Sequence, residues 1–172
     1  AGIIGSTGYA GAELVRLLLA HPQAEIVWYG SRSYIDKEYA SVYGNMFRLV
    51  DAVCMDDDLN TLADQADVIF TATPQGFCAS VMSDDLLRRT KVIDLSADFR
   101  LKDVAVYEKW YGITHKSPSY IKEAVYGLCE LYRDRIAGAR LVANPGCYTT
   151  CSILTLYPLV RAGLVDPSSI II

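Results

Sequence analysis

The sequence predicts an α/β fold built on a doubly wound, mainly parallel sheet. Short apolar runs typical of buried strands alternate with segments of helical periodicity along most of the chain. A glycine-rich turn follows the first run and opens the first helix. No internal repeat or low-complexity linker interrupts this order. The expected strands cover residues 2–4, 25–30, 50–55, 67–73, 91–95 and 140–143, and the expected helices cover 12–20, 57–66, 77–87, 132–136 and 149–161.

Composition excludes several classes of function. The chain has 172 residues, 52% hydrophobic, with a net charge of −4, so it lacks the clustered basic charge that nucleic-acid binding requires. No apolar run approaches the ~20 residues of a membrane span, and no basic-flanked signal segment opens the chain. We therefore expect a cytoplasmic protein with no membrane partner. Five widely spaced cysteines argue against a disulfide framework, and none has the neighbours of a metal site.

The first strand leads into a glycine-rich turn that predicts dinucleotide binding. Glycine permits a tight turn and a close approach of the backbone to a pyrophosphate at the helix N-terminus. The spacing is Gly-x-x-Gly-x-x-Gly instead of the common Gly-x-Gly-x-x-Gly, so close packing of the helix on the sheet is an alternative reason for the glycines. The residues expected to bind the cofactor here are Gly5, Ser6, Thr7, Gly8, Tyr9, Ala10 and Gly11.

The second strand ends in Ser31-Arg32-Ser33. An acidic residue at this place binds the ribose 2′-hydroxyl of NAD, whereas a basic residue accommodates the 2′-phosphate of NADP. Arg32 therefore favours NADP(H), the alternative being a solvated loop arginine. Residues 33–48 have no clean period and are expected to form an excursion at the sheet edge.

Two later strand ends supply further candidates. The 67–73 strand turns at Pro74 into a helix that holds Cys78, an expected core residue. After the 91–95 strand, Arg100 offers a guanidinium that could bind phosphate or carboxylate, or pair with a neighbouring aspartate. Residues 102–125, with His115, are expected to be irregular.

The chain then passes through a Pro-Gly turn to Cys147. Free N–H groups and the positive end of the dipole at a helix start favour an anion, which would make Cys147 a nucleophilic thiolate. The alternative is a small apolar residue that packs at the helix start. An apolar strand is expected to begin at residues 170–172, which suggests a fragment of a longer protein.

Five stretches together resemble the N-acetyl-γ-glutamyl-phosphate reductase family. They are residues 5–14, Ser31-Arg32-Ser33, the Asp-Leu-Ser-Ala-Asp-Phe-Arg run that ends at Arg100, Tyr126-Gly-Leu-Cys-Glu-Leu, and Asn144-Pro-Gly-Cys147-Tyr. The Asp-Leu-Ser-Ala-Asp-Phe-Arg and Asn-Pro-Gly-Cys-Tyr motifs are specific, whereas the glycine turn is shared with aspartate-semialdehyde dehydrogenases.

The resemblance implies an NADP-binding Rossmann domain over residues 1–146 and the start of a substrate and dimerisation domain at 147–172. It implies that Cys147 attacks an acyl phosphate and that NADPH reduces the resulting thioester to an aldehyde, chemistry that suits a soft thiolate. Arg100 and Asn144 would bind the phosphate or the carbonyl oxygen, with Ser31, Arg32, Pro74 and Ser96 at the cofactor. The full-length protein is expected to form a homo-oligomer.

The sequence departs from the family at Gln75, Cys129 and Thr149, where His, Pro and Pro are usual. The family's acid/base histidine has no counterpart here, because His21 and His115 lie in no matching motif. We expect that residue beyond Ile172 and expect the 172-residue piece not to turn over. The roles of Glu130 and His115 are not assigned. The alternatives are reduction of aspartyl phosphate or of carrier-bound aminoadipyl or glutamyl phosphate, a non-catalytic NADP sensor, and a structural domain without a ligand.

Overall fold

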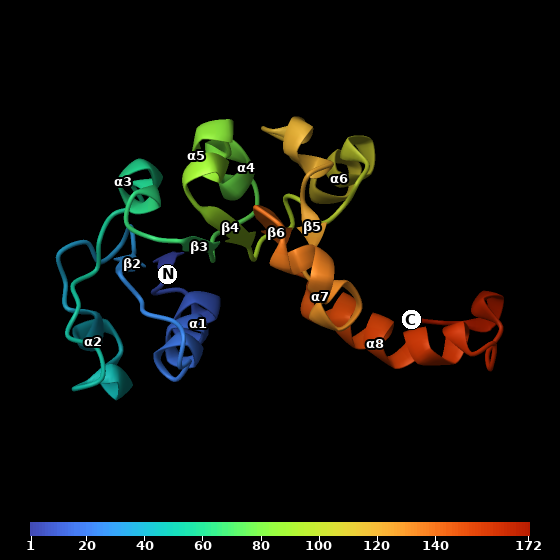
Figure 1. Cartoon of the computed structure of the whole chain (residues 1–172), viewed down its shortest axis with the longest axis horizontal. Coiled ribbons are helices and arrows are strands. Elements are labelled where there is room, and N and C mark those ends of the chain that lie inside the picture. Colours follow the sequence, from blue (N-terminus) through green and yellow to red (C-terminus); the bar gives the residue numbers. More distant parts are fainter.

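A computed structural model describes all 172 residues and contains one six-stranded sheet (Figure 1). The strands are β1 (Gly2–Ile4), β2 (Trp28–Gly30), β3 (Val68–Thr71), β4 (Lys91–Asp94), β5 (Val125–Tyr126) and β6 (Leu141–Ala143). Their order is β2-β1-β3-β4-β6-β5, and every pairing is parallel. The predicted doubly wound sheet is confirmed, and the chain changes direction across the sheet between β1 and β3.

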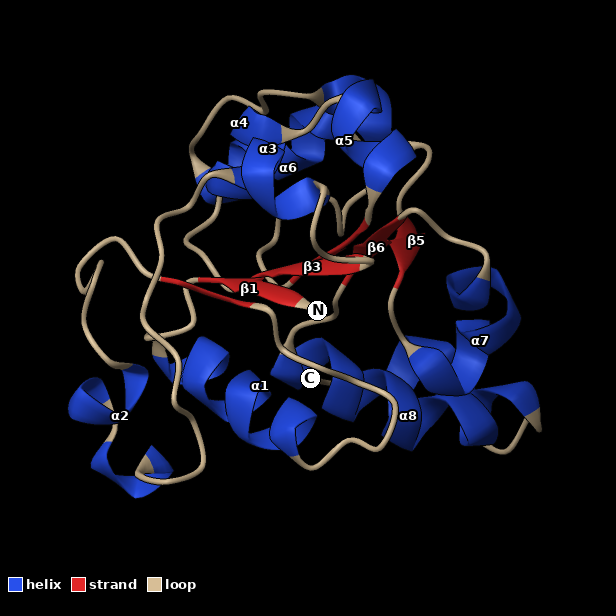
Figure 2. Ribbon diagram, turned by 60° about the vertical axis from the view of Figure 1, so that its left-hand side comes forward, coloured by secondary structure: helices blue, strands red, loops and turns tan.

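Helices cover both faces of the sheet (Figure 2). On one face lie α3 (Leu59–Ala63), α4 (Phe77–Val81), α5 (Asp84–Arg89) and α6 (Val104–Tyr111); on the other lie α1 (Tyr9–Leu19) and α7 (Cys129–Ala137). Helix α8 (Cys147–Arg161) begins on that second side and extends away from the sheet (Figure 1). The helix α2 (Tyr39–Val42) and three short 3-10 turns at Gly44–Met46, Pro118–Ile121 and Pro167–Ser169 complete the chain. No helix is both long and apolar enough to cross a membrane.

The core consists of two apolar clusters, one on each side of the sheet. Successive strand residues point to opposite faces, so Ile4 joins the larger cluster with α3 to α5, whereas Ile3 joins the smaller one with Val15 and Tyr39. All three residues of β1 are buried. This central strand is therefore covered on both sides, as a parallel sheet requires.

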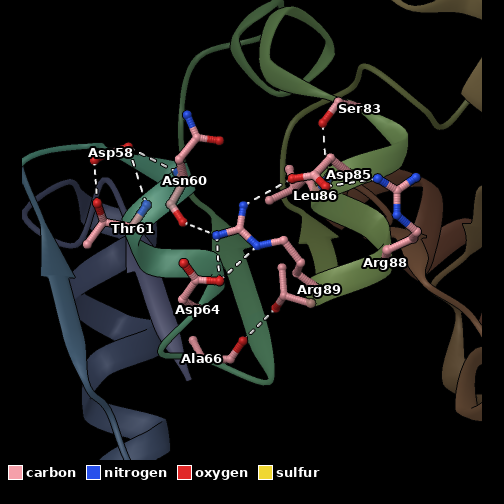
Figure 3. Close-up of polar contacts among 11 residues, drawn as sticks. Asp58, Asn60, Thr61, Asp64, Ala66, Ser83, Asp85, Leu86, Arg88 and Arg89 are labelled. Carbon is pink, nitrogen blue, oxygen red and sulfur yellow. Dashed lines mark hydrogen bonds and ion pairs between the residues drawn. The ribbon is translucent and has the colours of Figure 1, made fainter.

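Polar contacts tie α3 to α5 on the outer side of the larger cluster (Figure 3). Arg89 at the end of α5 donates to the Asp64 carboxyl group at 2.7 Å, to Asp85 at 3.1 Å and to the backbone carbonyl of Asn60. Each helix also has its own N-cap, since Asp58 accepts from the first turn of α3 and Ser83 accepts from Leu86 in α5. These contacts hold α3 and α5 together within one layer of helices.

Three expectations about local structure were wrong. Residues 50–55 form no strand, because only Val53 and Met55 pair, in isolated bridges to Glu38 and Gly30. The expected 77–87 helix is two helices, since Met82 is extended and the Ser83 side chain caps a new start. Residues 170–172 also form no strand.

The segment 102–125, expected to be irregular, contains α6. Asp103 caps this helix by accepting from Ala105 and Val106, and Gly112 ends it at a φ of +67°. Only Tyr107 is buried in α6, which explains why no apolar period was visible. The segment therefore supplies part of the helix layer above β4 and β5.

Candidate active site

The glycine turn after β1 is shaped by two close backbone approaches. Gly5 has a φ of +78°, and a Cβ at this position would lie 2.3 Å from the carbonyl oxygen of Ala72. A Cβ on Gly11 would lie 2.1 Å from the carbonyl oxygen of Gly5. The turn thus packs against both β3 and α1 at positions that only glycine can occupy. Gly8 has room for a Cβ at 3.4 Å, so packing does not require glycine there.

Helix α1 begins earlier than predicted, at Tyr9, and no side chain caps it. The N–H groups of its first turn are orphans of the helix geometry and are suited to an anion. Tyr9 itself is 98% exposed. The first turn of α1 therefore has the free donors and the glycine cradle that a dinucleotide phosphate requires.

Two tyrosines from the segment at the sheet edge, residues 33–48, form hydrogen bonds to the backbone of the glycine turn. The hydroxyl groups of Tyr39 and Tyr43 donate to the backbone carbonyls of Ser6 and Thr7, each at 2.9 Å. Sequence analysis missed both, because the contacts span 33 and 36 residues and no local pattern signals them. The excursion at residues 33–48 is a support for the glycine turn.

A cleft of about 310 Å³ opens beside the glycine turn at the carboxyl ends of β1, β2 and β3. Six of the predicted cofactor residues line it: Gly5, Thr7, Gly8, Ser31, Arg32 and Pro74. Their partners in the lining are Ser33, Asp57, Ala72, Thr73, Gln75 and Phe77. The hydroxyl groups of Thr7 and Ser31 lie 2.7 Å apart, which joins the glycine turn to the end of β2.

Other predicted cofactor residues do not line this cleft. Tyr9 and Ala10 are exposed at the start of α1. Ser6 is completely buried, and its hydroxyl group donates to the Gly30 carbonyl at 3.0 Å. The hydroxyl group of Ser96 donates to Asp94 at 2.8 Å. The Ser6 and Ser96 side chains are therefore engaged inside the fold.

A buried polar network follows β4 and reaches the turn beside the cleft. Asp94 accepts from Thr71 and from both donors of Ser96, and burial raises the pKa of its carboxyl group. Asp98 accepts from the Gly76 and Ala79 amides, at 2.7 and 2.9 Å, and from the Tyr107 hydroxyl group at 2.8 Å. Asp98 thereby fixes the turn after Pro74, one wall of the cleft.

Arg100 and Asn144 lie together, as predicted, but bind each other. Arg100 donates through Nε to the carbonyl oxygen of Asn144 and through Nη2 to that of Leu95, both at 2.7 Å. Only Nη1 is left without a partner, and it faces Gly146, where a Cβ would meet it at 3.2 Å. The side chain of Asn144 donates through Nδ2 to the backbone carbonyl of Pro145 at 3.2 Å. Arg100 thus fixes the loop before Cys147 and offers one nitrogen to a ligand.

Cys147 is the first residue of α8, directly after β6 and the turn that ends at Gly146. It is exposed and borders a pocket of about 340 Å³. The other residues of this pocket are Arg100, Leu101, Tyr111, Tyr126, Gly146, Tyr148 and Thr149. No side chain caps α8, so the N–H groups of its first turn lack a side-chain acceptor, and Cys147 shares its pocket with the guanidinium-bearing Arg100.

Neither histidine belongs to this pocket. His115 is buried, accepts the Ser117 amide at Nδ1 and lies 2.7 Å through Nε2 from the carbonyl oxygen of Asp98. Since Nδ1 accepts, Nε2 carries the proton, and His115 serves the network around Asp98. His21 is exposed at the end of α1. Glu130 is exposed in the first turn of α7.

The other four cysteines are arranged differently. Cys54 and Cys78 are buried, and burial raises the pKa of both thiols. Cys129 and Cys151 are exposed but do not line the pocket of Cys147. A hollow of about 660 Å³ near Ala1 and His21 lies at the opposite, amino edge of the sheet and contains none of the predicted site residues.

Comparisons with known proteins show the family to which the chain belongs. Residues 1–139 match the family described as semialdehyde dehydrogenase, NAD binding domain. An N-acetyl-gamma-glutamyl-phosphate reductase of Lachnospira eligens is 67% identical over 172 residues, covering 99% of this chain and 49% of the relative. The chain spans about half the length of the curated relatives it matches.

Solved structures show the same fold. Aspartate semialdehyde dehydrogenase II of Vibrio cholerae is 19% identical with a TM-score of 0.65, and the alignment covers 94% of this chain and 46% of that one. The aspartate semialdehyde dehydrogenase of Candida albicans, solved with NADP, is 17% identical with a TM-score of 0.57 over the same shares. The predicted fold and the family resemblance are confirmed: the chain belongs to the semialdehyde dehydrogenase family and forms its NAD(P)-binding domain.

Proposed function

We propose that this chain is the cofactor-binding half of an NADPH-dependent reductase that converts N-acetyl-γ-glutamyl phosphate to N-acetylglutamate semialdehyde, a step of arginine biosynthesis. One observation carries the proposal: an exposed cysteine begins an uncapped helix in a pocket at the same sheet edge as a dinucleotide cleft. The 67% identity to a reductase of that name supports the choice of substrate.

The residues of the cleft fit NADP(H). The glycine cradle at Gly5 and Gly11 leaves no room for side chains, which brings the backbone and the start of α1 close to a pyrophosphate. Arg32 lines the cleft beside Ser31 and Ser33, a set of donors suited to a 2′-phosphate. We therefore assign the pyrophosphate to the glycine turn and the 2′-phosphate to residues 31–33.

The chemistry of this chain centres on the sulfur of Cys147. The thiolate attacks the acyl carbon, a carbon–sulfur bond forms, and the carbon–oxygen bond to phosphate breaks as phosphate leaves with the electron pair. NADPH, when bound, supplies the hydride that converts the thioester to an aldehyde, and sulfur leaves as the thiolate. Two easier steps thus replace one difficult reduction.

The surroundings of Cys147 suit the charge that moves in the first step. The orphan N–H groups of α8 favour the thiolate and the negative oxygen that develops on the attacked carbon. The free Nη1 of Arg100 offers a donor to that oxygen or to the leaving phosphate. Tyr111 and Tyr126 border the same pocket, where the Tyr126 hydroxyl group lies 3.4 Å from Oγ1 of Thr149.

The proposal extends to the organisation of the full-length protein. Helix α8 has no buried residue and leaves the sheet toward one end of the molecule (Figure 1), which supports a second, substrate-binding unit that starts near residue 147. We place the acid/base residue in that unit, because neither histidine reaches the Cys147 pocket. Oligomer contacts belong there as well. The 172-residue piece should then show no steady-state reductase activity.

The direct test compares Cys147→Ser with Cys151→Ser in the full-length protein. Both cysteines are exposed, and they lie four residues apart in α8, which makes the second a matched control. With acyl phosphate and NADPH, Cys147→Ser should lower kcat by about 10³-fold or more, and Cys151→Ser should change it little. Equal losses in both variants would contradict the thioester route.

Alkylation separates an enzyme from a non-catalytic NADP sensor. Iodoacetamide should label Cys147 fastest at pH 7, because thiolate character governs the rate. The fair comparison is with Cys129 and Cys151, since Cys54 and Cys78 are protected by burial. Equal labelling rates for the three exposed thiols would favour the sensor.

A further inference from the structure

Arg32 is held on two sides where it borders the cofactor cleft. Its Nε donates to Oδ2 of Asp57 at 2.6 Å, and its guanidinium carbon lies 4.7 Å from the centre of the Phe77 ring. The three residues come from the end of β2, the loop before α3 and the first turn of α4, and all line the cleft. Contacts from two other segments thus hold the Arg32 side chain in place.

These contacts leave the end of the guanidinium free. Nε is the nitrogen bonded to Asp57, and neither Nη1 nor Nη2 has a partner within the chain. The Arg32 side chain is 69% exposed, whereas that of Asp57 is 12% exposed. Two adjacent nitrogens with a fixed geometry suit bidentate binding of a phosphate.

The backbone brings Asp57 to this place. The Ser31 amide donates to the Met55 carbonyl at 2.7 Å, and the Met55 amide donates to the Tyr29 carbonyl at 2.9 Å. This short pairing alongside β2 sets Asp57 beside Arg32. The other carboxyl oxygen of Asp57, Oδ1, is buried without a partner, so Arg32 is the only side chain that the carboxyl group contacts through a hydrogen bond.

We propose that Asp57 is a positioning residue for cofactor selectivity: it holds Arg32 through Nε so that the free nitrogens are preorganised for the 2′-phosphate of NADPH. The inference rests on the proposed function for the identity of the cofactor. Preorganisation matters because immobilising a long side chain on binding lowers affinity. The negative charge of Asp57 has the opposite effect on affinity, because it repels the phosphate. The two effects can be separated by mutation.

The test compares Asp57→Asn with Asp57→Ala in the full-length protein, titrated with NADPH and with NADH by nicotinamide fluorescence. Both variants remove the same charge, but only the asparagine oxygen can still accept from Arg32 Nε. We expect Asp57→Ala to bind NADPH about 2- to 12-fold more weakly than Asp57→Asn, the range for one ordered side chain. NADH, which lacks the 2′-phosphate, should bind both variants equally.

Equal NADPH affinity in the two variants would overturn the proposal and leave Asp57 as a repelling charge only. A parallel loss of NADH affinity in Asp57→Ala would also overturn it, because it would assign Asp57 to the shape of the cleft. If the wild-type protein binds NADPH selectively but reduces no acyl phosphate, the proposed function fails while the selectivity result remains valid.

Discussion

Replacing Asp98 should show that a buried helix cap contributes more to the free energy of unfolding than an exposed cap does. Its carboxyl group is completely buried and accepts three hydrogen bonds: two from the start of α4, through Gly76 and Ala79, and one from Tyr107. Asp98→Ala leaves all three donors without their acceptor. A buried donor left unsatisfied costs about 1–3 kcal/mol, so we expect a loss of about 4 kcal/mol in the free energy of unfolding.

Asp98→Asn has a smaller expected effect. The amide oxygen can keep the two bonds made to Oδ1, from the Gly76 amide and the Tyr107 hydroxyl group, whereas the NH₂ group then faces the Ala79 amide. One lost acceptor predicts a destabilisation of about 1–3 kcal/mol. The order of stability should therefore be wild type, then Asp98→Asn, then Asp98→Ala.

The control is Asp103, which caps α6 on the surface by accepting from Ala105 and Val106. Asp103→Ala should cost about 1 kcal/mol, the usual value for an exposed cap. Urea unfolding followed by circular dichroism measures all three variants. The reasoning is refuted if Asp98→Ala is no more destabilising than Asp103→Ala, because the buried contacts would then contribute nothing beyond capping.

Two further predictions follow from the same structure. Asp94→Asn should raise the free energy of unfolding above that of the wild type most strongly at high pH, because burial raises the pKa of the Asp94 carboxyl group in the folded state. As the pH falls through that pKa, the folded wild type takes up a proton and the difference between the two proteins should shrink. A difference that grows on acidification would contradict this. Gly11→Ala should destabilise the fold by about 1–3 kcal/mol and weaken NADPH binding, because its Cβ would lie 2.1 Å from the Gly5 carbonyl oxygen. The control is Gly138→Ala, whose Cβ would meet nothing within 4 Å. Thermal unfolding and NADPH titration should both show this control to be neutral.

Much of the fold was predictable because strand runs and turn residues carry local signals. The strand around Ile69 and the turn at Gly5 can each be recognised from a few neighbouring residues. The break at Ser83 was missed although its signals were present: a capping serine followed by Asp84 and Asp85 marks a helix start. Continuous apolar content across residues 77–87 hid it, because one amphipathic helix and two short ones present the same pattern.

The site was predictable in part, and the limit has a physical reason. Local sequence indicates which residue type stands at a strand end, but not what its side chain contacts. Ser6 and Ser96 lie in the predicted turns, yet the fold turns both hydroxyl groups inward. Asp57 was predicted only as the first residue of a helix over residues 57–66, since its partner Arg32 is 25 residues away.

Arg100 illustrates how the two halves of the site depend on each other. It follows β4 and binds the loop after β6, with 44 residues between the bonded groups. Two of its nitrogens donate to backbone carbonyls, so Arg100 positions the backbone that leads to Cys147 even without a ligand. Asp98, two residues earlier, fixes the turn that borders the cofactor cleft. One short loop therefore sets the position of the thiol on one side and of the wall of the cleft on the other, as the proposed hydride transfer to a sulfur-bound carbon would require.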